Sequence, residues 1–320
     1  MTICQTLDWA IEKLGQNKGK NKDNAELDAE ILLLHILNHD RAWLYSHAEY
    51  ILSPTELRRF RHHIVRRAKG EPVAYITEHK EFYGLDFYVN KNVLIPRPET
   101  ELMVENALQR ICRDTKFCAS TKNNKILVID IGAGSGCIPV TILKNLNSNC
   151  QIAKLLYCYA SDISKQALAI ARKNAKRHGI EKQIKFLQGN LLEPIIKEFS
   201  NGTMEQCSNG IVRQYSNGTI IITANLPYLS HEIYKTNYEN LKFEPKDALV
   251  SENNGLDLYE KILKQIKNSL LHCCIITLLL EIDPSQNRLI KTLIQKYFPK
   301  SKIQIKKDLA HKNRLVIINP

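Results

Sequence analysis

Hydrophobic positions recur with two different spacings along this chain, and the change divides it in two. The first part has the three- and four-residue spacing of an amphipathic helix, carried by Leu27, Ile31, Leu34 and Leu37. A second helix is predicted to begin at Ser53, because serine caps helices and the proline at position 54 favours a first turn. We therefore expect residues 1–85 to form a small all-α N-terminal domain.

The second part, residues 86–320, alternates short apolar runs with amphipathic segments. Strands are predicted at 125–131, 155–161, 184–187, 219–224, 275–281, 302–307 and 314–319, and helices at 99–112, after Gly136, and at 165–178, 256–271 and 287–297. Strand, helix and strand in succession give parallel pairing through right-handed crossovers. We therefore expect an α/β fold with a seven-stranded, mostly parallel sheet, whose ligand lies outside the carboxyl ends of the strands.

One segment breaks this alternation. The triplet Ser-Asn-Gly occurs at 200–202, 208–210 and 216–218. Each copy is a turn signal, because Asn and Gly tolerate a positive φ. We interpret residues 198–218 as an inserted loop.

Composition excludes several classes of protein. With 44% hydrophobic and 24% charged residues the chain is neither disordered nor collagen-like. The longest apolar stretch, 273–280, is far shorter than the roughly 20 residues that span a bilayer. The first residues lack a basic region followed by an apolar one, so we expect no secretory signal. Nine cysteines without a Cys-x-x-Cys pair indicate a reducing compartment, with neither a disulfide framework nor a zinc site. We expect a cytoplasmic protein without a metal.

The charge is strongly basic but unevenly placed. Lys and Arg number 45 against 33 Asp and Glu, a net charge of +12, while residues 1–83 hold 12 of each. The whole excess therefore lies in residues 84–320. It fits a solvated surface, and it also fits an acidic or nucleic-acid partner, so charge alone leaves both interpretations open.

A glycine-rich turn follows the strand predicted at 125–131, and its residues are Gly132, Ala133, Gly134, Ser135 and Gly136. Glycine lets a ligand approach the backbone, and the following helix supplies unpaired N–H groups. The spacing is Gly-x-Gly-x-Gly, and Cys137 occupies the position that would complete the dinucleotide fingerprint. This difference favours S-adenosyl-L-methionine over NAD.

Polar residues also end the next two predicted strands. Asp162 lies where the hydroxyls of a ribose would be bound, although an aspartate there could equally cap a helix or form a salt bridge. Asn190 and Leu191 lie where the amino group of an adenine would be recognised, and an amide can accept that hydrogen bond. These three residues are candidates for cofactor binding.

The sequence Asn225-Leu226-Pro227-Tyr228 ends the strand predicted at 219–224. Asn225 offers a side-chain carbonyl, and the Leu226 main-chain carbonyl points the same way because a residue before proline is held extended. With Tyr228 as a flat face, such a site can hold a planar NH₂ group beside a methyl donor. Positioning and removal of water supply most of the acceleration, so neither a strong base nor a metal is needed. A plain Asn-x-Pro turn is the alternative.

Together, the glycine-rich turn and the Asn225–Tyr228 motif resemble those of class I, Rossmann-like, S-adenosylmethionine-dependent methyltransferases. Three further segments are similar to the HemK/PrmC family, the protein-(glutamine-N5) methyltransferases of peptide chain release factors: residues 70–76 (GEPVAYI), 81–84 (EFYG) and 93–101 (VLIPRPETE). The resemblance continues through residues 243–245 and 248–249, Glu281, and residues 308–310 and 313–314. It covers nearly the whole chain apart from residues 198–218.

The resemblance implies a role for each matching position. The cofactor S-adenosyl-L-methionine would be held by Gly132, Ala133, Gly134, Ser135, Gly136, Asp162, Asn190, Leu191 and Asn225. The catalytic pair would be Asn225 and Tyr228, which with Leu226 and Pro227 hold the glutamine of a Gly-Gly-Gln loop, while Phe82, Arg97, Pro98, Glu99 and Thr100 shape the substrate side. The partner would be a class-1 release factor, gripped with the help of the helical domain. We expect a monomer with no membrane contact and no direct nucleic-acid binding.

Departures from the family pattern leave two alternatives. Leu226 replaces the first proline of the usual Asn-Pro-Pro-Tyr, and Asn190 and Leu191 replace an aspartate and a bulky aromatic residue. Asn-Leu-Pro-Tyr also resembles the motif of ribosomal RNA adenine dimethyltransferases, which act on another planar NH₂ group. A non-catalytic binding protein with the same fold is the second alternative.

Overall fold

The structure, a computed structural model, describes residues 1–15, 23–118, 126–146, 156–201, 219–269 and 275–320. These residues divide into two compact units, Met1–His79 and Lys80–Pro320. The boundary proposed from the sequence, residue 85, falls in a short hairpin whose Phe82 and Phe87 are buried in the core of the second unit. Most of the predicted inserted loop, residues 202–218, lies outside the described residues.

The first unit is helical, as expected. Its elements are α1 (Ile3–Gly15), α2 (Asp23–Leu37), α3 (Arg41–Ser46), α4 (Pro54–Ala68) and α5 (Val73–Thr77). The predicted helix start at Ser53 is present as a reciprocal capping box. The Ser53 hydroxyl accepts from the Glu56 backbone N–H at 3.2 Å, and the Glu56 carboxylate accepts from the Ser53 N–H at 2.8 Å.

Helix α2 was located correctly by its apolar spacing, but that spacing does not mark its buried face. Leu27 and Ile31 are 44% and 39% exposed. The side chains that enter the core of this unit are Ala25, Ala29, Leu32, Leu33 and Ile36. Apolar residues occur on more than one side of this helix, so periodicity alone could not identify the side that packs.

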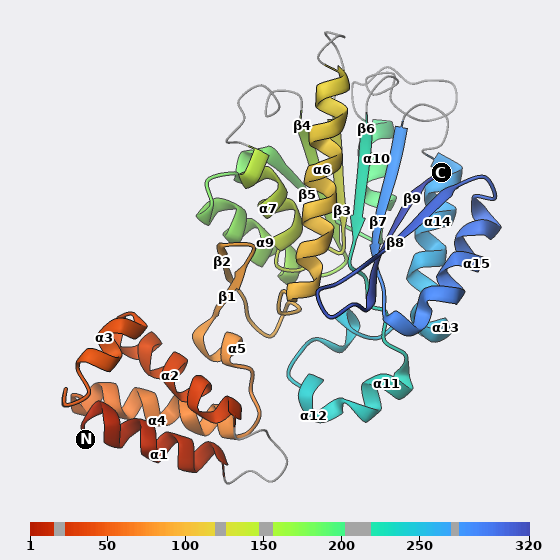
Figure 1. Cartoon of the computed structure of the whole chain (residues 1–320). Coiled ribbons are helices and arrows are strands. Elements are labelled where there is room, and N and C mark those ends of the chain that lie inside the picture. Colours follow the sequence, from red (N-terminus) through yellow and green to blue (C-terminus); the bar gives the residue numbers. More distant parts are fainter. Residues whose placement is uncertain (16–22, 119–125, 147–155, 202–218, 270–274) are drawn as a thin grey trace. The chain divides into compact units, whose positions relative to one another are not determined.

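The second unit contains every strand of the structure's main sheet (Figure 1). The strands are β1 (His79–Phe82) and β2 (Leu85–Tyr88), which form the hairpin, and β3 (Ile126–Ile131), β4 (Leu156–Asp162), β5 (Ile184–Gln188), β6 (Thr219–Ala224), β7 (Ile275–Glu281), β8 (Lys302–Lys307) and β9 (Asn313–Asn319). The helices are η1 (Pro98–Thr100), α6 (Glu101–Cys118), α7 (Cys137–Leu146), α9 (Lys165–Arg177), η2 (Glu181–Gln183), α10 (Glu193–Asn201), α11 (His231–Thr236), α12 (Tyr238–Leu241), η4 (Lys246–Ala248), α13 (Glu252–Gly255), α14 (Asp257–Ser269), η5 (Pro284–Gln286) and α15 (Asn287–Tyr297).

The main sheet has seven strands in the order β5-β4-β3-β6-β7-β9-β8. Neighbours from β5 to β7 pair in parallel, whereas β9 is antiparallel to both β7 and β8. This is the seven-stranded, mostly parallel sheet that was predicted. Because β3 pairs with β4 and with β6, Ile131 lies opposite both Ser161 and Ala224, and the carboxyl ends of these strands meet at one edge.

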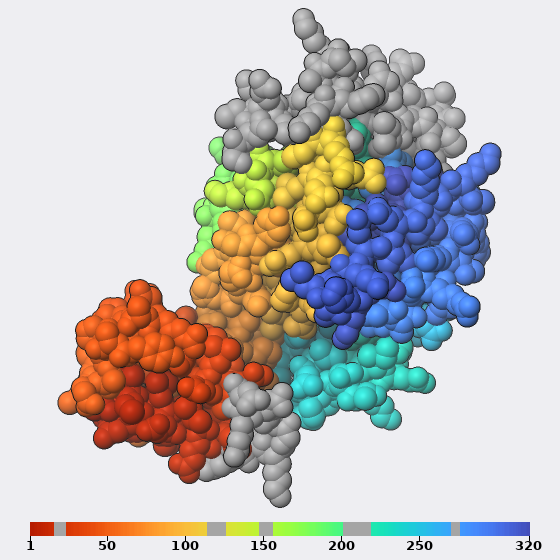
Figure 2. All heavy atoms as spheres, viewed as in Figure 1, coloured from red at the N-terminus to blue at the C-terminus, as the bar shows by residue number. Residues whose placement is uncertain are grey.

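Helices cover both faces of the sheet. Alternate residues of β3 enter different cores, since Leu127 and Ile129 pack with α10, α14 and α15 while Ile126 and Val128 pack with α6, α7 and α9. The space-filling view shows the C-terminal strands, in blue, beside α6, in yellow (Figure 2). The same view shows α11 and α12, in cyan, at the surface, where neither helix has a buried residue.

The described ranges contain neither a membrane-spanning helix nor a metal-binding cluster. None of the helices there is both long and apolar enough to cross a membrane. No group of three His, Cys, Asp or Glu side chains in the same ranges is arranged to hold a metal ion.

Candidate active site

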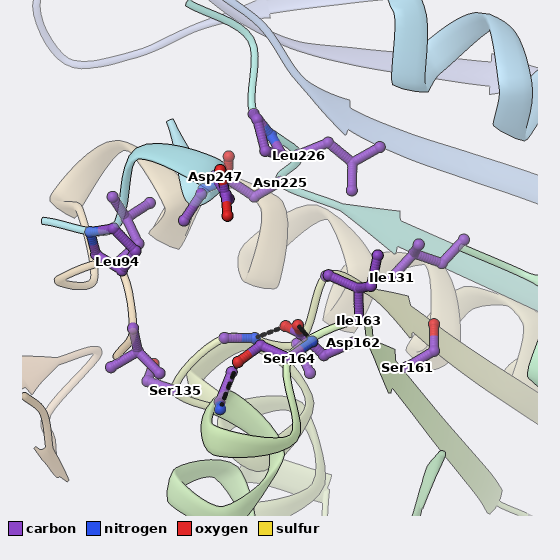
Figure 3. A pocket seen from close by; sticks show the side chains of 18 of the residues that line it. Leu94, Ile131, Ser135, Ser161, Asp162, Ile163, Ser164, Asn225, Leu226 and Asp247 are labelled. Atoms are coloured by element: carbon purple, nitrogen blue, oxygen red, sulfur yellow. Dashed lines mark hydrogen bonds between the residues drawn. The ribbon is translucent and has the colours of Figure 1, made fainter. Parts of the chain in front are cut away.

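A cavity of about 590 Å³ lies at the carboxyl edge of the main sheet. Its walls come from the ends of β3, β4 and β6, the turn after β5, and the segments before η1 and around η4. Asn225 and Asp247 lie on one side of it and Ser135 and Asp162 on the other (Figure 3). A volume of this size is typical of sites for small-molecule cofactors.

The glycine-rich turn needs its glycines for different reasons. Gly132, Gly134 and Gly136 all have positive φ angles, of 76°, 53° and 79°. A Cβ on Gly132 would lie 3.1 Å from the Leu226 side chain, and one on Gly136 would lie 3.1 Å from Ala171. A Cβ on Gly134 would meet no atom closer than 3.9 Å. Packing therefore explains the outer two glycines, while the middle one leaves space at the wall of the cavity.

Asp162 is held in place by main-chain donors. Its Oδ2 accepts from the Gly134 N–H at 2.9 Å and its Oδ1 from the Ser164 N–H at 2.8 Å. Each carboxylate oxygen can accept a further hydrogen bond, so the group could still bind two hydroxyls. Burial raises the pKa of Asp162 above its ordinary value. The next residue, Ile163, is 70% exposed and lines the same cavity, which gives a flat ligand an apolar surface beside the carboxylate.

The turn after β5 brings Asn190 and Leu191 to the cavity. The Asn190 Nδ2 donates to Glu193 Oε1 at 3.0 Å, which leaves the Oδ1 of the amide as an acceptor for a ligand. Leu191 has a positive φ of 52°, an unfavourable conformation for a leucine, and its carbonyl accepts from the Ser161 hydroxyl at 2.7 Å. Strain of this kind is common at binding sites.

At the end of β6, Asn225 begins a chain of hydrogen bonds that leads into the protein. Its Nδ2 donates to Thr100 Oγ1 at 3.1 Å, and the Thr100 hydroxyl donates to Glu281 Oε2 at 2.7 Å. Thr100 and Glu281 are both 2% exposed. Burial raises the pKa of Glu281 to about 7. The Asn225 Oδ1 is therefore the end of the amide that remains for a ligand.

Tyr228 is fixed at both its hydroxyl and its backbone. The hydroxyl donates to Glu281 Oε1 at 3.2 Å, and the main-chain carbonyl accepts from Gln286 Nε2 at 2.9 Å. Burial raises the pKa of the Tyr228 phenol, so this group stays neutral. Gly255 has a φ of 78°, and a Cβ there would lie 1.9 Å from the Tyr228 carbonyl oxygen.

Glu281, Gln286 and Gly255 were not predicted as residues of the site. The available signals were a lone carboxylate after the apolar run 275–280 and the inclusion of Glu281 in the family resemblance. Neither signal indicates which residues Glu281 would contact, because those residues are far away along the chain.

A second cavity, of about 340 Å³, shares Asn225 with the first. Asn225, Leu226 and Arg97 line both cavities, whereas Tyr228 lines the second. Arg97 is oriented by the buried Glu244, whose Oε1 accepts from its Nη2 at 2.5 Å. The same carboxylate accepts from the Ile95 N–H at 3.1 Å, so Glu244 fixes the segment before η1.

Not every residue proposed for the substrate side reaches a cavity. Thr100 and Arg97 do, but Phe82, Pro98 and Glu99 are absent from the lining of both. Phe82 is 1% exposed and packs against the edge of the Phe87 ring, with 6.1 Å between the ring centres. The Phe82 ring belongs to the hydrophobic core, so any influence of Phe82 on the substrate side would be exerted through packing, and its role there stays a prediction. Pro98 is exposed where it starts η1.

These residues fit S-adenosyl-L-methionine. The surface of the large cavity is mainly apolar, and its polar side chains include the Asp162 carboxylate and the Asn190 amide. The space at Gly134, where a Cβ would meet nothing within 3.9 Å, would accept the cofactor next to the backbone. The parallel sheet, the glycine-rich turn and the cavity at the carboxyl edge together define a methyltransferase of the class I fold, and the family described as "Methyltransferase domain" matches residues 122–201.

Comparison with known proteins identifies the family within that class. The family described as "PrmC N-terminal domain" matches residues 5–77. Release factor glutamine methyltransferases are similar to this chain over most of its length: that of Bacillus anthracis is 32% identical, covering 99% of this chain and 98% of the relative. That of Bacillus subtilis is 33% identical (98% and 96%), and that of Leptospira interrogans is 38% identical (94% and 93%). The chain belongs to the release factor glutamine methyltransferase family.

Proposed function

We propose that this protein transfers a methyl group from S-adenosyl-L-methionine to the side-chain amide nitrogen, N5, of the glutamine in the Gly-Gly-Gln motif of class-1 peptide chain release factors. The names of its relatives support this substrate. The single observation that carries the chemistry is the position of Asn225 between the two cavities, with its Nδ2 bound to Thr100 and its Oδ1 left as an acceptor.

The larger cavity would hold the cofactor. Asp162 would accept hydrogen bonds from the ribose hydroxyls, and the Asn190 Oδ1 would accept one from the adenine amino group. Ile163 would pack against the adenine plane. When bound, the cofactor supplies an electrophilic methyl group on a positively charged sulfur.

The smaller cavity would hold the glutamine. The two N–H groups of the glutamine amide would donate hydrogen bonds to Asn225 Oδ1 and to the Leu226 main-chain carbonyl. This pair of bonds would turn the amide nitrogen towards the larger cavity. Tyr228 would pack against the amide plane with a neutral hydroxyl. Holding the nitrogen in one orientation and excluding water would account for most of the acceleration, since these side chains offer no strong base.

The adenine alternative has the same requirement for a planar NH₂ group, so the site geometry does not separate the two substrates. The full-length relatives favour glutamine, because they are named for it. A non-catalytic protein would have no need of the Asn225 arrangement.

The test is methyl transfer with isotope-labelled cofactor. Purified protein is incubated with a class-1 release factor or with ribosomal RNA, and the Gly-Gly-Gln peptide is analysed by mass spectrometry. One added methyl group on the glutamine is expected, and a release factor with that glutamine replaced is the control. Label in RNA alone, or on another residue of the release factor, would overturn the proposal.

A further inference from the structure

We propose that Glu281 is a positioning residue that determines which end of the Asn225 carboxamide faces the substrate. This inference rests on the proposed function, because it concerns the acceptor that would hold the glutamine NH₂ group. Glu281 itself contacts neither cavity; it acts through Thr100.

The hydrogens that are available determine the direction of the hydrogen bonds between Glu281, Thr100 and Asn225. An ionised carboxylate can only accept, and a threonine hydroxyl has one hydrogen to donate. Because Thr100 lies 2.7 Å from Glu281 Oε2, its hydrogen is used there. The Thr100 oxygen must then accept from Asn225, 3.1 Å away, and only the Nδ2 end of the amide can donate. An ionised Glu281 therefore forces the Asn225 Oδ1 towards the ligand.

The other contacts of Glu281 support this orientation. Its second oxygen, Oε1, accepts from the Tyr228 hydroxyl at 3.2 Å. Its main-chain carbonyl accepts from the hydroxyl of Tyr259 on α14, which fixes the end of β7. One carboxylate thus orients both Asn225 and Tyr228, the two residues proposed to hold the glutamine.

Other ionisable groups act on this carboxylate from each side. Arg314 on β9 favours its charged form and is itself held by Asp308 at 3.2 Å, whereas Glu99 in η1 disfavours it. The Tyr228 phenol faces the Glu281 carboxylate from the loop after β6. The negative charge of Glu281 also contributes to raising the pKa of the Tyr259 phenol and of the Cys137 thiol. Burial is the largest influence and raises the pKa of Glu281 to about 7.

Protonation of Glu281 would reverse the direction of the hydrogen bonds that connect it to Thr100 and Asn225. A neutral Glu281 can donate its hydrogen to Thr100, and the threonine hydroxyl can then donate to the Oδ1 of a rotated Asn225 amide. The Nδ2 group would face the NH₂ group of the glutamine, donor against donor. Methyl transfer should therefore fall as the pH drops below about 7, by about tenfold for each pH unit, while cofactor affinity stays the same.

The test compares E281Q with D130N. Asp130 is a matched control, because it is also fully buried, burial raises its pKa to about 7, and it binds a threonine, Thr223, at 2.6 Å. Methyl transfer to the release factor is measured from pH 6 to pH 8, as kcat and KM separately. We expect the acidic loss of kcat to persist in D130N and to vanish in E281Q, which should also turn over at least tenfold more slowly at pH 8.

Two Thr100 variants separate positioning from folding. T100V removes the hydroxyl that connects Glu281 to Asn225, so kcat should no longer fall at acidic pH. T100S keeps a hydroxyl, so the fall in kcat at acidic pH should remain. An acidic loss that survives in E281Q would overturn the inference even if methyl transfer to the release factor is established.

A second readout does not depend on the substrate. In protein labelled with ¹⁵N-asparagine, the side-chain amide signal of Asn225 is followed by NMR through the same pH range, and N225A identifies it. The signal should shift with a midpoint near pH 7 in the wild type and in D130N, but not in E281Q. An Asn225 signal independent of pH in the wild type would overturn the inference. Absence of methyl transfer at every pH, with the NMR shift present, would overturn the proposed function alone.

Discussion

The replacement of Asn225 by alanine tests the proposed arrangement most directly. It removes one of the two acceptors for the glutamine NH₂ group. A positioned hydrogen-bonding group lost from an active site costs about 3 kcal/mol in the transition state, which corresponds to a drop in kcat of about a hundredfold. Folding should be little affected, because Asn225 is only partly buried and Thr100 keeps its bond to Glu281. The expected loss of stability is below about 1.5 kcal/mol.

The matched control is Asn190→Ala, an asparagine at the cofactor end of the same cavity. Losing one neutral hydrogen bond there should raise the cofactor Kd by up to about tenfold and leave kcat at saturating cofactor unchanged. Turnover is measured by mass spectrometry of the Gly-Gly-Gln peptide, and the cofactor Kd by calorimetry. The reasoning is refuted if Asn225→Ala turns over near the wild-type rate, or if the two variants lose cofactor affinity equally.

Three further variants test other parts of the site. Gly255→Ala should displace the Tyr228 carbonyl, 1.9 Å from the new Cβ, and thereby lower kcat and destabilise the fold by about 1–3 kcal/mol, as activity and thermal unfolding would show; wild-type values of both would contradict the steric argument. Asp162→Ala should raise the cofactor Kd at least tenfold in calorimetry without preventing release factor binding, and unchanged cofactor affinity would exclude its role at the ribose. The third variant is E281Q. In the wild type, folding raises the pKa of Glu281 from 4.5 to about 7, so the folded state holds this proton more tightly than the unfolded chain does. The wild type therefore loses stability as the pH rises from 4.5 to 7. The stability of E281Q relative to the wild type should therefore increase between pH 4.5 and 7 in urea unfolding, whereas parallel curves would contradict it.

The regular part of the fold could be predicted because its signals are local. Buried parallel strands are continuous apolar runs, so the ranges predicted for β6 and β7 coincide with those observed. The helical spacing of apolar residues likewise predicted the observed range of α15. The hairpin of β1 and β2 and the short helices α11 and α12 were not predicted. Their segments are too short to show a period. The structure of the hairpin depends on packing of Phe82 and Phe87 into the core of the second unit, whereas neither α11 nor α12 has a buried residue.

The candidate site likewise has one part that could be predicted from the sequence and one part that could not. The glycine-rich turn and the Asn225 motif could be found because each is contiguous and follows a strand. Glu281, Gln286 and Gly255 could not, since their importance arises from Tyr228 and Thr100, to which folding alone brings them close. Conversely, Phe82 lies within a recognisable motif, yet it belongs to the core.

The hydrogen bonds between Thr100, Asn225 and Glu281 join residues that are 125 and 181 positions apart. A chain still being synthesised cannot complete this set of bonds until β7, which ends at Glu281, has left the ribosome. A truncated product that ends before Glu281 contains the sequence of the glycine-rich turn, but it lacks the carboxylate proposed to orient the amide. Incomplete copies of this protein would therefore lack the orientation of Asn225 on which the proposed methyl transfer depends.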